Sequence, residues 1–115
     1  MGESATTIAL VRDLMFVSKI TATAAAAGTT VRIVRDPAKL EVAAGQLLLV
    51  DLNLSGAIPA AVNWRAATGG RTIGFVSHVD AATAAEAKSA GTDHVVARRR
   101  FVDLLPGLLA GDGIP

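Results

Sequence analysis

Leu47-Leu48-Leu49-Val50, followed at once by Asp51, is the stretch of the sequence that decides the fold. Four consecutive large aliphatic residues predict a strand that is buried on both faces, as in the middle of a parallel sheet. A carboxylate that ends such a strand belongs at the open edge of the sheet, because burying it without a partner would cost several kcal/mol. We therefore expect Leu47–Val50 to be the central strand and Asp51 to face a crevice.

Short aliphatic runs of the same kind alternate along the chain with longer segments rich in Ala and Leu. Strict alternation of strands and helices predicts a parallel sheet with helices on both faces, because the crossover connections are right-handed. The sequence therefore predicts an α/β fold, a doubly wound (βα)₅ sheet, in a single domain spanning 1–115 with its core at about 6–110. The further strands are expected at Ile8–Val11, Val31–Val34, Thr72–Val76 and His94–Ala97, and the helices at Leu14–Ala27, Pro37–Ala44, Ile58–Ala67, Ala81–Ala90 and Phe101–Ala110.

Composition excludes several classes of protein. The 11 Lys and Arg against 10 Asp and Glu leave a net charge of +1, which argues against a basic nucleic-acid binder. No cysteine and only 2 histidines argue against disulfide scaffolds, thiol chemistry and histidine-rich metal sites. The longest uncharged runs, 20–31 and 52–64, are shorter than the roughly 20 apolar residues of a membrane span. With no signal peptide visible, we expect a soluble, cytoplasmic domain that contacts neither membrane nor nucleic acid.

The residues that end the strands are the candidates for function, because ligands of such sheets bind beyond the carboxyl ends of the strands. Asp13 and Asp51 can converge on one pocket beside the Ser77 hydroxyl, which would suit a divalent cation and a phosphoryl group. An aspartate can also accept a phosphoryl group as a nucleophile. The simpler alternatives are that Asp51 caps a loop, that Asp13 caps a helix and that Ser77 faces solvent.

Four segments together resemble the receiver domain of two-component response regulators, the CheY-like fold. Leu49–Gly56 is similar to the family's phosphoacceptor segment, Val11-Arg12-Asp13 to its acidic Mg²⁺-binding pair, Phe75–His78 to the end of its fourth strand and Ala87–Val96 to its approach to strand five. The resemblance implies strand order 2-1-3-4-5, with the helices after strands one and five on one face. It also implies a signalling module without enzymatic activity, with Asp51 as phosphoacceptor and a kinase or output protein as partner. If a metal binds, Asp13, Asp51 and Asn53 would hold it.

The sequence departs from the receiver pattern at two places. Arg12 stands in the acidic pair, and Ala97-Arg98 stands where the family has Lys-Pro. Since arginine is permanently charged and pairs well with carboxylates, we expect Arg12 to contact Asp13 or Asp51 and to disfavour Mg²⁺. The expected cofactor is therefore none, or Mg²⁺ held weakly.

These departures favour a pseudo-receiver that acts by protein–protein interaction with weak or no phosphorylation at Asp51. One alternative is a working receiver in which Arg12, Arg98 or Arg99 replaces the missing groups. Another is a flavodoxin-like domain that binds a small molecule, although no glycine-rich phosphate loop follows the first strand.

A contact face is expected on the fourth helix, the fifth strand and the fifth helix, where receivers commonly form homodimers or bind partners. The expected fourth helix, Ala81–Ala90, is smooth because it carries many alanines, among them Ala84 and Ala85. Small side chains lose little conformational entropy when a partner covers them. Arg98, Arg99 and Arg100 would give this face a charged rim.

Overall fold

A five-stranded parallel sheet forms the centre of the protein, in the order β2-β1-β3-β4-β5. The structure is a computed structural model that describes residues 7–40, 47–77 and 80–110. The order 2-1-3-4-5 and the central position of the Leu47 strand are both confirmed. The strands are β1 (Thr7–Leu10), β2 (Val31–Val34), β3 (Leu47–Asp51), β4 (Arg71–Val76) and β5 (His94–Ala97).

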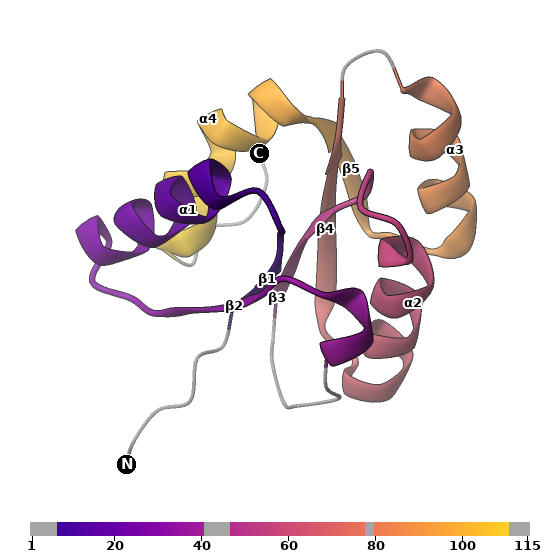
Figure 1. Ribbon diagram of the computed structural model, residues 1–115, viewed down its shortest axis with the longest axis horizontal. Coiled ribbons are helices and arrows are strands. Elements are labelled where there is room, and N and C mark those ends of the chain that lie inside the picture. Colours follow the sequence, from indigo (N-terminus) through magenta and orange to yellow (C-terminus); the bar gives the residue numbers. More distant parts are fainter. Residues whose placement is uncertain (1–6, 41–46, 78–79, 111–115) are drawn as a thin grey trace.

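Helices cover both faces of the sheet, as the alternation predicts. Figure 1 shows α1 and α4 together on one side of the strands, and α2 and α3 on the other. The pairing of the helices after strands one and five on one face is therefore confirmed. The helices are α1 (Leu14–Ala26), α2 (Ala57–Thr68), α3 (Ala81–Ala90) and α4 (Arg98–Leu109).

Each face of the sheet carries its own apolar core. Under α1 and α4, the rings of Phe16, Phe75 and Phe101 stack at centroid distances of 4.4 to 5.8 Å within an otherwise aliphatic cluster. Under α2 and α3, Trp64 is the largest buried side chain. Every residue of β3 is buried, because cores lie on both of its faces.

Two expected helices differ from those observed. The segment expected as a helix over Pro37–Ala44 begins with a 3₁₀ turn at Pro37–Lys39 (η1), and Leu40 already has extended backbone angles. A proline at the first position favours a helical start, but Leu40 ends it after a single turn. The rest of that expected helix lies outside the described residues.

The last helix begins three residues before its expected start at Phe101, because β5 runs directly into α4 with only Ala97 as N-cap. The ring of Pro106 lies inside this helix, where it cannot donate to the carbonyl one turn earlier. The apolar stripe formed by Phe101, Leu105 and Leu108 nevertheless holds the helix on the sheet. The direct connection brings Arg98 to the carboxyl edge of the sheet.

Among residues 7–40, 47–77 and 80–110, no helix is both long and apolar enough to cross a membrane.

Candidate functional site

Asp51 lies at the carboxyl end of the central strand and is only 9% exposed. The chain continues in register for one more residue, since the Leu52 N–H donates to the Phe75 carbonyl at 3.0 Å. It then turns, and the Asn53 main-chain N–H donates to Asp51 Oδ1 at 3.0 Å. Asp51 therefore has a fixed orientation at the edge of the sheet, as its place in the sequence predicts.

Burial is the main influence on the charge of Asp51. Partial removal from water raises the pKa of this carboxyl group above its ordinary value. The Asn53 N–H and the positive charge of Arg98 lower the pKa, and the nearby carboxylate of Asp13 raises it again, but burial outweighs them. Asp51 is thus a strand-end carboxylate that carries its charge at an energetic cost.

Asp13 caps α1 and is the second carboxylate near Asp51. Its Oδ1 accepts hydrogen bonds from the N–H groups of Met15 at 2.9 Å and Phe16 at 3.4 Å. This confirms the simpler alternative, an N-cap. Since Asp13 also influences the pKa of Asp51, it lies near enough to affect the same crevice.

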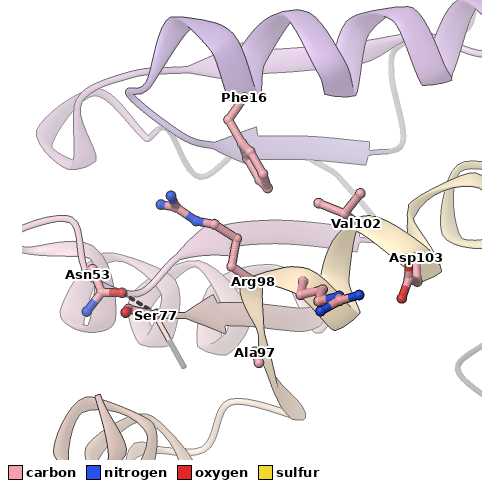
Figure 2. Close-up of a pocket in the computed structure, with 8 residues that line it drawn as sticks. Phe16, Asn53, Ser77, Ala97, Arg98, Val102 and Asp103 are labelled. Atoms are coloured by element: carbon pink, nitrogen blue, oxygen red, sulfur yellow. Dashed lines mark hydrogen bonds between the residues drawn. The ribbon is translucent and has the colours of Figure 1, made fainter. Parts of the chain in front are cut away.

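Arg98 supplies the positive charge beside Asp51. One terminal nitrogen of its guanidinium group lies 3.8 Å from Asp51 Oδ2. The guanidinium carbon lies 5.3 Å from the centre of the Phe16 ring and 5.8 Å from that of Phe75, within the range of cation–π contact. Figure 2 shows the side chain extending from α4 into the space between Phe16 and Asn53. Two aromatic rings therefore hold the arginine where it faces the carboxylate.

The expected pairing of Arg12 is wrong in this structure. Arg12 is exposed and forms no ion pair with Asp13 or Asp51, both of which lie in the described part of the chain. Val11 is buried in the core, whereas Arg12 is exposed, and its main-chain carbonyl accepts a hydrogen bond from Arg35 Nε.

Asn53 and Ser77 are brought together, but not through the hydroxyl group of Ser77. The Ser77 main-chain N–H donates to Asn53 Oδ1 at 2.8 Å, the bond drawn as a dashed line in Figure 2. The Asn53 side-chain amide donates to the carboxylate of Asp80. Asp80 in turn caps α3 by accepting from the Thr83 N–H at 3.0 Å.

An open pocket lies beside these residues, between α1 and α4. The sequence singled out Asn53, Ser77, Ala97, Arg98 and Arg99 from this region, but it gave no signal for Phe16. The aromatic contact with Arg98 could have been suspected only once α1 and α4 were known to share a face. The pocket is lined by Phe16, Asn53, Ser77, Ala97, Arg98, Arg99, Val102 and Asp103.

The donor set fits a divalent cation poorly. Within the described residues, no group of three or more His, Cys, Asp or Glu side chains could hold a metal ion. Asp13 is a carboxylate near enough to influence Asp51, but it is already occupied as a helix cap. The Arg98 guanidinium beside Asp51 would repel a cation placed there.

No protein-family model matches the sequence, and no curated protein matches it. Solved structures do match in fold. A response regulator from Hahella chejuensis has a TM-score of 0.78 at 15% identity over 93% of each chain. A CheY-like receiver domain from Methanospirillum hungatei JF-1 has a TM-score of 0.71 at 18% identity, covering 94% of this chain and 96% of that one.

A third matching structure contains a phosphorylated aspartate and a metal ion. It is a response regulator from Burkholderia pseudomallei with a phosphorylated aspartic acid, a calcium ion and citrate, with a TM-score of 0.74 at 16% identity. The match covers 92% of this chain but 66% of that one, so about a third of that protein has no counterpart here. The fold of this protein is therefore the CheY-like fold of response regulator receiver domains.

Proposed function

We propose that this protein is a receiver-like signalling module that acts by contact with a partner protein and is phosphorylated weakly or not at all at Asp51. The observation that carries the proposal is the position of Arg98, whose guanidinium lies 3.8 Å from Asp51 Oδ2 in a receiver fold. Its charge offsets that of Asp51 without a metal ion. The likeness in fold to response regulators supports the two-component class of signalling.

A permanent arginine and a bound divalent ion differ in what they can do for phosphoryl transfer. Both can neutralise charge, but only a metal ion acts as a Lewis acid on the phosphoryl oxygens. Phosphoryl transfer depends on cations that are already positioned where negative charge develops. A crevice with two carboxylates and an arginine is therefore expected to take up Mg²⁺ weakly and to react slowly.

The second candidate function is a working receiver that uses Arg98 in place of the missing lysine. It is favoured by the same contact, because a guanidinium that reaches Asp51 could also pair with phosphoryl oxygens. The two functions differ in whether Mg²⁺ enters the crevice.

The partner is proposed to bind the face made of α3, β5 and α4. Ala81, Ala82 and Ala85 are exposed on α3, and β5 pairs with β4 alone, at the edge of the sheet. Arg99 and Arg100 are exposed at the start of α4. A second copy of this chain or an output protein with acidic groups around a flat apolar centre would fit this face.

A Mg²⁺ titration followed by amide NMR of the 115-residue chain tests the proposal. In the unmodified protein, the amides of Asp13, Asp51 and Asn53 are expected to shift little up to millimolar Mg²⁺. The Arg98→Ala variant loses the guanidinium that lies beside Asp51, and it is expected to show saturable shifts at these amides. Saturable micromolar binding by the unmodified protein would favour the working receiver instead.

A further inference from the structure

Asn53 stands between the strand-end carboxylate and the start of α3. Its main-chain N–H donates to Asp51 Oδ1 at 3.0 Å, and its side-chain oxygen accepts from the Ser77 N–H at 2.8 Å. Its side-chain nitrogen donates to Asp80 Oδ2. One residue thus contacts Asp51, the end of β4 and the cap of α3 at the same time.

The next link fixes the first turn of α3. Asp80 Oδ1 accepts from the Thr83 N–H at 3.0 Å, and the Asp80 carbonyl accepts from the Ala84 N–H at 3.2 Å. The Asp80 N–H also donates to the Ser77 carbonyl at 2.9 Å, so the cap is attached to the end of β4. Loss of an N-cap side chain commonly destabilises a helix start.

The Ser77 hydroxyl takes no part in this chain of contacts. Within the described residues, the hydrogen bond of Ser77 to Asn53 uses the main-chain N–H, and its hydroxyl makes none. The contact between Asn53 and Ser77 therefore does not depend on the Ser77 hydroxyl.

We infer that Asn53 is a positioning residue that couples the charge of Asp51 to the N-terminus of α3 through its side-chain amide. A charged Asp51 makes a charge-assisted bond to the Asn53 N–H and fixes the turn after β3. That turn aims the amide of Asn53 at Ser77 and Asp80. Replacing the Asp51 carboxylate by a neutral amide weakens the first bond, and the restraint that the Asn53 side chain places on Asp80 weakens with it.

The inference deepens the proposed function, because α3 belongs to the face proposed to contact a partner. The coupling itself requires neither phosphorylation nor a partner. The coupling would explain how a change in the charge of Asp51 affects the start of α3 without a large movement of the backbone.

Amide hydrogen exchange of the full chain, read by NMR, tests the coupling in the absence of Mg²⁺, phosphodonor or partner. Asp51→Asn removes the charge and keeps the shape and one acceptor oxygen. Exchange at Thr83 and Ala84 is expected to become about two- to fivefold faster, the size of change that a weakened hydrogen bond gives. Amides later in α3, such as that of Lys88, are expected to keep their rates.

The same substitution is then made in four other backgrounds, one of them Ser77→Ala, in which the effect on Thr83 should persist. Asn53→Ala removes the side-chain amide. Asn53→Asp keeps the acceptor for Ser77 but opposes Asp80 with a like charge. In both backgrounds, Asp51→Asn is expected to leave the exchange rate at Thr83 unchanged. With Asn63→Ala, an exposed asparagine on α2 that serves as the matched control, the full effect should persist.

Three results would overturn the inference. One is an equal acceleration at Thr83 with and without Asn53. Another is an absence of any change at Thr83 when Asp51→Asn is made alone. Loss of the effect in Ser77→Ala would assign the route to the hydroxyl instead, and would also contradict it. Because no phosphodonor is present, a failure of the proposed function in its own Mg²⁺ titration leaves these outcomes unaffected.

Discussion

Asp51 combines a buried position with one arginine at 3.8 Å, a separation longer than that of a hydrogen-bonded ion pair. Burial raises the pKa of this carboxyl group despite Arg98. A group whose pKa is higher in the folded protein than in the unfolded chain favours folding only while it is protonated. That contribution is present below the unfolded pKa and is lost as the pH rises through the folded pKa.

Asp51→Asn is therefore expected to stabilise the protein at neutral pH, by roughly 1 kcal/mol or less, because it removes a charge that burial disfavours. The stability difference between the two proteins should vanish at acid pH, where Asp51 is protonated, and grow as the pH rises above the unfolded value of 3.8. Thermal unfolding of both proteins from pH 3 to pH 7 measures this difference. If Asp51→Asn destabilises the protein at pH 7, burial is not the main influence on the Asp51 carboxyl group.

Individual site residues could be predicted where they follow directly from strand and helix ends. Asp51 follows a run of buried aliphatic residues, and Asp13 precedes a helix, so both positions could be read from the sequence. The choice of Arg98 over Arg12 could not. It depends on the exposure of Arg12 to solvent and on two phenylalanine rings, contributed by α1 and β4, that contact Arg98.

At the scale of elements, Asp93 joins α2 to the amino-terminal end of β4, directly before β5 begins. Arg65 on α2 pairs with both carboxylate oxygens, at 3.0 and 2.8 Å, and the Thr72 N–H donates to the same carboxylate at 2.8 Å. The hydrogen bonds from Arg65 lower the pKa of Asp93 to about 2, with smaller help from Thr72. A lowered pKa stabilises the fold above the unfolded pKa, and this stabilisation is lost as the pH falls toward 2.

Asp93→Asn is accordingly expected to lower the melting temperature by several degrees at pH 7, since it removes the charge that Arg65 and Thr72 bind. The difference from the unmodified protein should shrink as the pH is lowered toward 2. Asp103→Asn, an exposed aspartate on α4, is the matched control and should have little effect at either pH. A constant difference across the range would mean that Asp93 does not act through its charge.

Gly74 on β4 leaves room for the side chain of Leu52, the residue that directly follows Asp51. A Cβ atom on Gly74 would lie 2.5 Å from a methyl carbon of Leu52, which is buried next to Asp51. Gly74→Ala is expected to destabilise the fold by about 1–3 kcal/mol, as overpacking of a core does. Chemical denaturation measures the loss. Adding Leu52→Ala should recover part of it, and strictly additive losses would contradict the contact.

The boundaries of elements were harder to predict than their presence. Every expected strand exists, because runs of Val, Ile and Leu are unambiguous when glycines and helices flank them. The sequence predicts the last helix from Phe101, whereas α4 begins at Arg98 and includes all three arginines. Buried Phe101 and Leu105 hold the helix to the sheet, and no local signal in the arginines indicates this.

For the whole molecule, strict alternation predicts a parallel sheet but does not by itself fix the order of its strands. The order came from the resemblance to receivers, and the structure confirms it. The same order places β5 at one edge, with α3 and α4 on either side of it. This arrangement makes the exposed alanines of α3 part of a surface that a second molecule could cover.

Ala85→Glu is expected to dissociate any dimer formed through this face, because it places a charge on a surface that would be desolvated. Ala85 is the better test position, since Ala84 packs against the core under α2 and α3. Ala66→Glu, at an exposed alanine of α2, is the control. Light scattering after gel filtration gives the masses. If the unmodified protein is oligomeric and Ala85→Glu leaves its mass unchanged, the interface lies elsewhere.

The central claim is that Arg98 occupies the place of the metal's charge beside Asp51, so that the site reacts poorly with phosphodonors. Intact-protein mass spectrometry after incubation with acetyl phosphate and Mg²⁺ tests it most directly. The account predicts that the unmodified chain keeps its mass, within the few per cent of labelling that Asp51→Asn also shows. Stoichiometric addition of one phosphoryl group, abolished by Asp51→Asn, would contradict the account and identify a working receiver.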